Sequence, residues 1–121
     1  MVPLEGVHPV LTGGETKPNT GRPVCPIAHQ GARTLLYDVF FTLAGGISAE
    51  VGTSEVSVPE AEIKRAFAAN SRSTVLCVDS TMLGGRFPAR AIDLADISAW
   101  VTRLDSGDER LDRYRALVEI P

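Results

Sequence analysis

The sequence has few of the residues that build metal centres and disulfide frameworks. Its 121 residues include two cysteines, two histidines and one tryptophan. Cys25 and Cys77 are too few for a disulfide framework, and Cys77 lies in the apolar run VLCV, where we expect a buried strand. His8 and His29 lack the spacing of a metal-binding pair. We therefore expect no metal and no cofactor, and a reduced, cytoplasmic setting is the default.

Positive charge and long apolar runs are also scarce. Lysine and arginine number 12 against 15 acidic residues, which gives a net charge of −3 and a pI near 5.3. Binding to DNA without sequence preference needs a basic face, and none is evident. No apolar run approaches the roughly 20 residues of a membrane helix. The start, MVPLEGVHPV, lacks the basic and apolar regions of a signal peptide.

Fingerprints of nucleotide binding and of common catalysis are missing. The sequence has no GxxxxGK[ST], no GxGxxG between a strand and a helix, and no GxSxG. P-loop enzymes, dinucleotide-dependent enzymes and serine hydrolases are therefore disfavoured. We expect that the protein is not an enzyme and has no catalytic residues.

Apolar runs alternate with helical patterns along the chain. This alternation predicts an α/β fold, an open and mainly parallel sheet with flanking helices. The near-continuous apolar runs at 39–43 and 75–78 predict adjacent, central, parallel strands buried on both faces. Further segments follow from the same patterns: strands at 7–12, 98–102 and 117–120, an edge strand at 87–92, a helix at 26–37, and a loop at 47–56.

Two helix starts have capping-box spacing. Ser57 with Glu60 begins a helix whose first turn tolerates Pro59 and whose apolar face includes Ile63 and Ala66. Ser106 repeats the pattern three residues before Glu109 and predicts a second capped helix, which carries Leu111 and Tyr114.

Glycine pairs and a polar pair follow the predicted strands. Gly13-Gly14, Gly45-Gly46 and Asp79-Ser80 come after apolar runs, and Gly84-Gly85 follows shortly. Ligands of open α/β sheets bind beyond the carboxyl ends of the strands, where glycine lets backbone N–H groups approach an anion. We therefore predict that the first three pairs meet at one end of the sheet. The alternative, that the glycines only make tight turns, stays open.

Glu62 and Lys64 lie two residues apart on the capped helix, so their side chains project to opposite flanks of its apolar face. Either could line a pocket at the helix start. The alternative is a solvated flank.

Five stretches resemble, in order, the C-terminal sensor domain of DeoR-family transcription regulators: LTGGETKPNTG at 11–21, LAGGIS at 43–48, EAEIKRAF at 60–67, VDSTMLGGR at 78–86 and DISAWVTR at 96–103. That domain shares its fold with ribose-5-phosphate isomerase and glucosamine-6-phosphate deaminase. Because the stretches cover most of the chain from residue 8 onward, their order and spacing are more specific than any one motif.

The resemblance implies the effector-sensing portion of a transcriptional repressor that binds a phosphorylated sugar or related metabolite. The ligand-binding residues would be Gly13, Gly14, Gly46, Glu62, Lys64, Asp79 and Ser80. The glycine backbones would admit the ligand, Lys64 would meet its negative charge, and Glu62 and Asp79 would accept sugar hydroxyls. The resemblance further implies that DNA is contacted only through a helix-turn-helix domain, and we expect no membrane partner. We also expect the chain to expose an apolar surface and to form a homo-oligomer, because large exposed apolar patches favour association.

Two departures from the family pattern affect this site. Gly45 stands where the family has the aspartate of its Gly-Ala-Asp-Gly segment, and Met82 stands where it has a lysine. We therefore expect weak effector binding. Two alternatives remain: an isomerase-like enzyme remnant with Glu62 or Asp79 as general base, and an oligomerisation module without a ligand. We expect residues 1–121 to form one domain, the C-terminal portion of such a sensor, with 1–6 loose.

Overall fold

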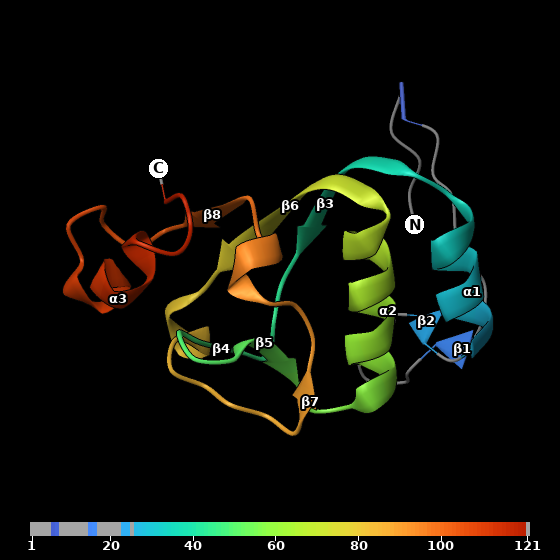
Figure 1. The fold of residues 1–121 in the computed structure, drawn as a ribbon, viewed down its shortest axis with the longest axis horizontal. Helices are drawn as coiled ribbons and strands as arrows, with labels where there is room; N and C mark the ends of the chain where they lie inside the picture. The colour runs from blue at the N-terminus through green and yellow to red at the C-terminus, as the bar shows by residue number, and fades with distance from the viewer. Residues whose placement is uncertain (1–5, 8–14, 17–22, 25, 121) are drawn as a thin grey trace.

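The structure is a computed structural model, and it describes residues 6–7, 15–16, 23–24 and 26–120. Strands and helices alternate through the middle of the chain, which confirms the predicted α/β class (Figure 1). In chain order the elements are β1 Glu15–Thr16, β2 Pro23–Val24, α1 Pro26–Thr34, β3 Tyr37–Thr42, β4 Gly46–Ser48, β5 Gly52–Glu55, α2 Val58–Ala69, β6 Ser71–Val78, η1 Ser80–Met82, β7 Ala89–Arg90, η2 Leu94–Asp96, β8 Ala99–Thr102, η3 Glu109–Leu111 and α3 Asp112–Arg115.

A parallel sheet forms the frame of the described residues. Its strand order is β3-β6-β8, with Phe41 opposite Val75 and Val75 opposite Ala99. The segments 39–43 and 75–78 are therefore adjacent and parallel, as the sequence predicts. Among the described residues 75–78 is central and 39–43 lies at one end of the sheet; the strand predicted at 7–12 lies, except for Val7, outside the described residues.

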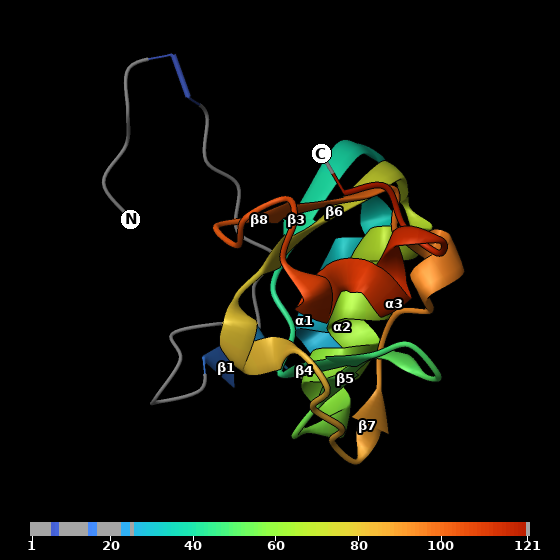
Figure 2. The ribbon, with the colours of Figure 1, turned by 90° about the vertical axis from the view of Figure 1, so that its left-hand side faces the viewer.

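The two faces of this sheet differ in exposure. Thr42, Leu76 and Trp100 are buried on the face that the described helices cover (Figure 2). The other face carries Phe41, which is 66% exposed, and Val101, which is 54% exposed. The prediction that these strands are buried on both faces is therefore wrong. An apolar run in the sequence does not show whether another element covers each face of the strand. We call this surface the open sheet face; it comprises Val39, Phe41, Leu43, Val75, Cys77 and Val101.

A hairpin replaces the loop predicted at 47–56. β4 and β5 pair antiparallel, and β7 pairs with β5 at the edge of the same sheet, which confirms the predicted edge position. Gly52 has a φ of +79° at the turn of the hairpin. The Thr53 N–H donates to the Ile92 carbonyl at 2.9 Å. Pattern reasoning missed this sheet because its short strands, with the sequences GIS, GTSE and AR, show no apolar alternation.

Helix α2 begins as its sequence predicts. The Ser57 hydroxyl accepts the Glu60 N–H at 3.3 Å, and a proline lies in the first turn. Ile63 and Ala66 are buried with Ala32 of α1, and the two helices lie side by side (Figure 1). Stacking of Phe67 on Phe40 of β3, with ring centroids 5.2 Å apart, fixes α2 against the parallel sheet.

The C-terminal segment differs from the prediction. Asp108, not Ser106, caps the next helical turn, because its carboxylate accepts the Arg110 N–H at 2.9 Å. The predicted strand at 117–120 is reduced to a single bridge between Ala99 and Glu119. The buried Tyr114 of α3 nevertheless packs on Trp100 with ring centroids 4.8 Å apart, so the segment closes the main core.

Candidate functional site

Two strand ends meet at the carboxyl edge of the parallel sheet. Thr42 lies opposite Leu76, so β3 and β6 end at the same edge. The chain then continues into Gly45-Gly46 after β3 and into Asp79-Ser80 after β6. The structure therefore brings Gly46 and the Asp79-Ser80 turn to one end of the sheet. Gly13 and Gly14, predicted at the same place, lie outside the described residues.

Gly46 is required for close backbone packing. A Cβ atom on Gly46 would lie 2.5 Å from the carbonyl oxygen of Gly85. The Gly84 N–H donates to the Ile47 carbonyl at 2.8 Å and ties the same two segments together. Because the chain itself fills the space beside Gly46, the structure explains this glycine by the contact between the segment after η1 and strand β4.

Lys64 forms a buried ion pair at the end of β3. Its Nζ lies 2.5 Å from Oε1 of Glu55 on β5, and it also donates to the Leu43 carbonyl at 2.8 Å. The other carboxylate oxygen of Glu55 accepts the Gly45 N–H at 3.1 Å. The Lys64 and Glu55 side chains are 11% and 5% exposed. The negative charge that Lys64 meets in this structure is thus the carboxylate of Glu55.

Sequence reasoning missed Glu55. It lies in GTSE, a stretch interpreted as loop, and nothing in its local pattern indicates a buried carboxylate. Its pairing with Lys64 depends on the β4–β5 hairpin, which brings β5 against α2. Only recognition of that hairpin could have placed the two side chains together.

Asp79 organises the turn after β6. Its Oδ1 accepts the Thr81 N–H at 3.0 Å, and the Thr81 and Ser80 hydroxyls donate to the same oxygen. The Thr81 N–H above all, then the Thr81 and Ser80 hydroxyls and the positive charge of Arg103, hold the pKa of Asp79 below its ordinary value. The carboxylate therefore stays ionised and acts as an acceptor at neutral pH.

A shallow hollow lies beside this turn. It has a volume of about 590 Å³ and is lined by residues that follow or end all strands of the parallel sheet, including Leu43, Asp79, Ser80 and Arg103. Arg103 comes directly after β8 and was not singled out from the sequence. The Arg103 cation and the acceptors of the Asp79 turn thus line the same hollow.

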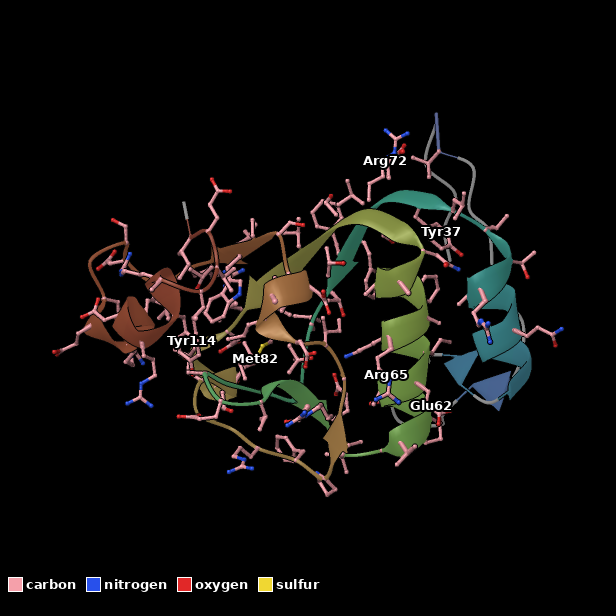
Figure 3. The ribbon with its side chains drawn as sticks, viewed as in Figure 1. Tyr37, Glu62, Arg65, Arg72, Met82 and Tyr114 are labelled. Carbon is pink, nitrogen blue, oxygen red and sulfur yellow. The ribbon has the colours of Figure 1, made fainter. Side chains whose placement is uncertain are left out.

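Glu62 does not join these residues. It is exposed and borders a different hollow with Arg33 and Arg65, and Figure 3 places it on α2 close to Arg65. A helix turns about 100° per residue, so Lys64, two residues on, points to the opposite flank. Glu62 and Lys64 therefore lie on opposite flanks of α2, as the sequence predicts, and Glu62 borders a hollow that Lys64 does not line.

Met82 belongs to the main core. It is buried and packs in the same cluster as Tyr114, beside which Figure 3 shows it. Position 82 therefore supplies an apolar side chain to the core and no cation. Within the described ranges, no group of three or more His, Cys, Asp or Glu residues could hold a metal ion. The described helices are also too short or too polar to cross a membrane.

Comparison with known proteins identifies the family. The model of the DeoR C-terminal sensor domain matches residues 3–103, which include both strand ends, α2 and the Asp79 turn. A search of curated proteins gives no match. The match spans well over half of the chain and agrees with the α/β fold. The chain therefore belongs to the DeoR C-terminal sensor domain family, whose role is effector sensing in a DeoR-type transcription regulator.

Proposed function

We propose that this domain senses a phosphorylated sugar or a related metabolite at the carboxyl edge of its parallel sheet. The observation that carries the proposal is the convergence of Lys64 Nζ and the Gly45 N–H beside the end of β3. A lysine and a backbone amide at the carboxyl end of a strand suit a phosphate group. In the intact regulator, an effector that binds one conformation better than another shifts the DNA-binding equilibrium.

The remaining groups suit a polyol. The ionised Asp79 carboxylate accepts hydroxyl hydrogen bonds, and Ser80 offers a hydroxyl beside it. Arg103 adds positive charge to the hollow. These groups follow β6 and β8, whereas Lys64 reaches the Leu43 carbonyl after β3, so we propose that the ligand extends across neighbouring strand ends.

We expect the affinity to be weak. Met82 is buried in the core and supplies no cation, and Gly45 has no carboxylate for a sugar hydroxyl. Restoring a cation with Met82→Lys would place a charge among apolar side chains, so we expect it to reduce stability rather than to improve binding.

Calorimetry with a panel of sugar phosphates and the matching neutral sugars tests the proposal. We expect binding of at least one sugar phosphate, no binding of its neutral sugar, and loss of binding in Asp79→Asn. Glu62→Gln is the matched control, since Glu62 is an exposed carboxylate outside the site. Silence for the whole panel at millimolar concentration would contradict the proposal.

The enzyme alternative is less well supported. A sugar isomerase needs a general base whose pKa lies near the working pH. Asp79 has a lowered pKa, and Glu62 lies outside the site. We therefore propose a binding domain without catalytic activity.

The second candidate is a homo-oligomerisation module, and the open sheet face favours it. A parallel sheet normally has both faces covered. In the described part of the chain Phe41 and Val101 are more than half exposed on one face. We propose that the domain forms homo-oligomers through this face and reaches DNA only through a separate helix-turn-helix domain.

A further inference from the structure

The Glu55 carboxylate is bound as an anionic ligand would be. Two donors from distant parts of the chain converge on it, one on each oxygen: the Gly45 N–H at 3.1 Å and Lys64 Nζ at 2.5 Å. A backbone amide together with a lysine is a common way to hold a carboxylate or a phosphate. The structure thus contains a complete oxyanion site that holds a side chain of the protein itself.

The site does not depend on Glu55 for its shape. Lys64 is also anchored by the Leu43 carbonyl at 2.8 Å, so its ammonium group has a second fixed partner. The Gly45 amide belongs to the connection between β3 and β4, which both sheets hold in place. Both donors therefore stay in position when the carboxylate is exchanged for another anion.

Solvent reaches the edge of this site. Gly45 is exposed, although its N–H points to a buried carboxylate. Glu55 is the last residue of β5, and the next residue, Val56, is 70% exposed. The carboxylate is thus one residue away from a surface position to which its side chain could turn.

We propose that the Gly45 amide and the Lys64 ammonium group form the phosphate subsite of the effector, and that Glu55 fills this subsite until the effector displaces it. This inference rests on the proposed function. Glu55 is then a built-in competitor with a high effective concentration. A phosphate carries a charge of about −1.5 to −2 at neutral pH, against −1 for a carboxylate, so the competition selects phosphorylated sugars over sugar acids.

Glu55→Gln tests the inference, because glutamine keeps the length and volume of the side chain and removes its charge. The probe is inorganic phosphate, and the measurement is the amide NMR signal of Gly45 during titration of the 121-residue chain. We expect Glu55→Gln to bind phosphate at least about tenfold more tightly than the unaltered chain, since a charged competitor is removed. The control Glu50→Gln, an exposed carboxylate in the same hairpin, should behave like the unaltered chain. The double variant Glu55→Gln, Lys64→Met should lose the gain. Equal phosphate affinity in Glu55→Gln and the unaltered chain overturns the inference.

A parallel titration with ribose 5-phosphate and ribose separates this inference from the proposed function. In one outcome the sugar phosphate binds the unaltered chain without shifting the Gly45 amide signal, and Glu55→Gln does not change its affinity. The function then stands and the inference falls. If Glu55→Gln gains phosphate binding and no sugar phosphate of the panel binds any variant more tightly than inorganic phosphate, the inference stands and the function falls.

A stability measurement covers the case in which Glu55→Gln is unfolded. Glu55→Ala leaves a space of carboxylate size beside Gly45 and Lys64. Added phosphate should raise the unfolding midpoint of Glu55→Ala more than that of the unaltered chain, and sodium chloride at equal ionic strength should not. Equal shifts from both salts overturn the inference.

Discussion

At the scale of single residues, the best-defined feature is a buried charge pair in which both side chains have further hydrogen-bond partners. Each oxygen of the Glu55 carboxylate has a donor, and Lys64 is held by two acceptors. Such a pair adds little net stability over an apolar pair of the same size, but it is costly to break, because one buried charge is then left alone. Lys64 and Glu55 are therefore coupled in any mutational study.

Removing Lys64 alone should be strongly destabilising. Lys64→Met leaves the 5%-exposed Glu55 side chain without its cation. We expect a loss of about 3–5 kcal/mol in the free energy of unfolding, measured by urea denaturation. Glu62→Gln on the same helix is the control and should change stability by less than about 0.5 kcal/mol, because Glu62 is exposed. A loss of stability in Lys64→Met as small as that in the control would show that the pair is not buried in solution.

Gly46 should not tolerate a methyl group. In Gly46→Ala the new Cβ would lie 2.5 Å from the backbone oxygen of Gly85, so one of the two segments must move. We expect a loss of about 1–3 kcal/mol by thermal or urea unfolding. Gly107→Ala is the matched control, since a Cβ there has nothing within 4 Å. A neutral result for Gly46→Ala would mean that the contact between the two segments is loose.

At the scale of elements, the C-terminal turn depends on one ionised side chain. Asp108 caps η3 and binds the Arg110 guanidinium at 2.8 Å. Arg110, through its side chain and then its N–H, lowers the pKa of Asp108 to about 2. The folded-state pKa lies below the ordinary value, so the cap is fully present above pH 3.8 and is lost as the pH falls toward 2.

An NMR titration of the Asp108 carboxyl group checks this. We expect an apparent pKa of about 2 in the unaltered chain and a higher pKa in Arg110→Gln, because the main stabilising partner is gone. The matched control is Arg113→Gln, which alters another exposed arginine of the same segment. A pKa of Asp108 at its ordinary value in the unaltered chain would refute the cap.

The sequence predicts some elements well and others poorly, for physical reasons that differ. Ser57 and the helix it caps could be predicted because capping and apolar periodicity are local properties. The β4–β5 hairpin could not, since its short strands GIS and GTSE show no alternating pattern and β5 is held by pairing with β4 and β7. The strand ends of the site followed from the parallel fold, whereas Glu55 required the hairpin that was missed.

At the scale of the whole molecule, the main exposed apolar feature of the described residues is the open sheet face. Its exposed apolar side chains come from strands on both sides of β6 and form one surface of the described residues. Large exposed apolar patches favour association. The sequence predicts a homo-oligomer but not the location of this surface, because burial of a strand face depends on which other elements cover it.

We expect the chain to self-associate through this face. Sedimentation velocity should show oligomers whose fraction rises with concentration, and Phe41→Lys should shift the population to monomer by placing a charge in the interface. Val56→Lys is the control, since Val56 is exposed on the connection after β5 and lies outside the face. A compact monomer at high concentration in the unaltered chain would count against the oligomer.

The carbonyl oxygen of Ile47 has a consequence for how ligand binding can be observed. This single atom accepts the Gly84 N–H at 2.8 Å and the Tyr114 hydroxyl at 3.2 Å, so it links the segment after the Asp79 turn to α3. Tyr114 in turn packs on Trp100, the one tryptophan of the sequence. A shift of either loop of the site therefore alters the surroundings of a natural fluorophore. Emission of Trp100 should report occupancy of the site without any label, and Tyr114→Phe, which keeps the ring and removes the hydroxyl, should reduce that response.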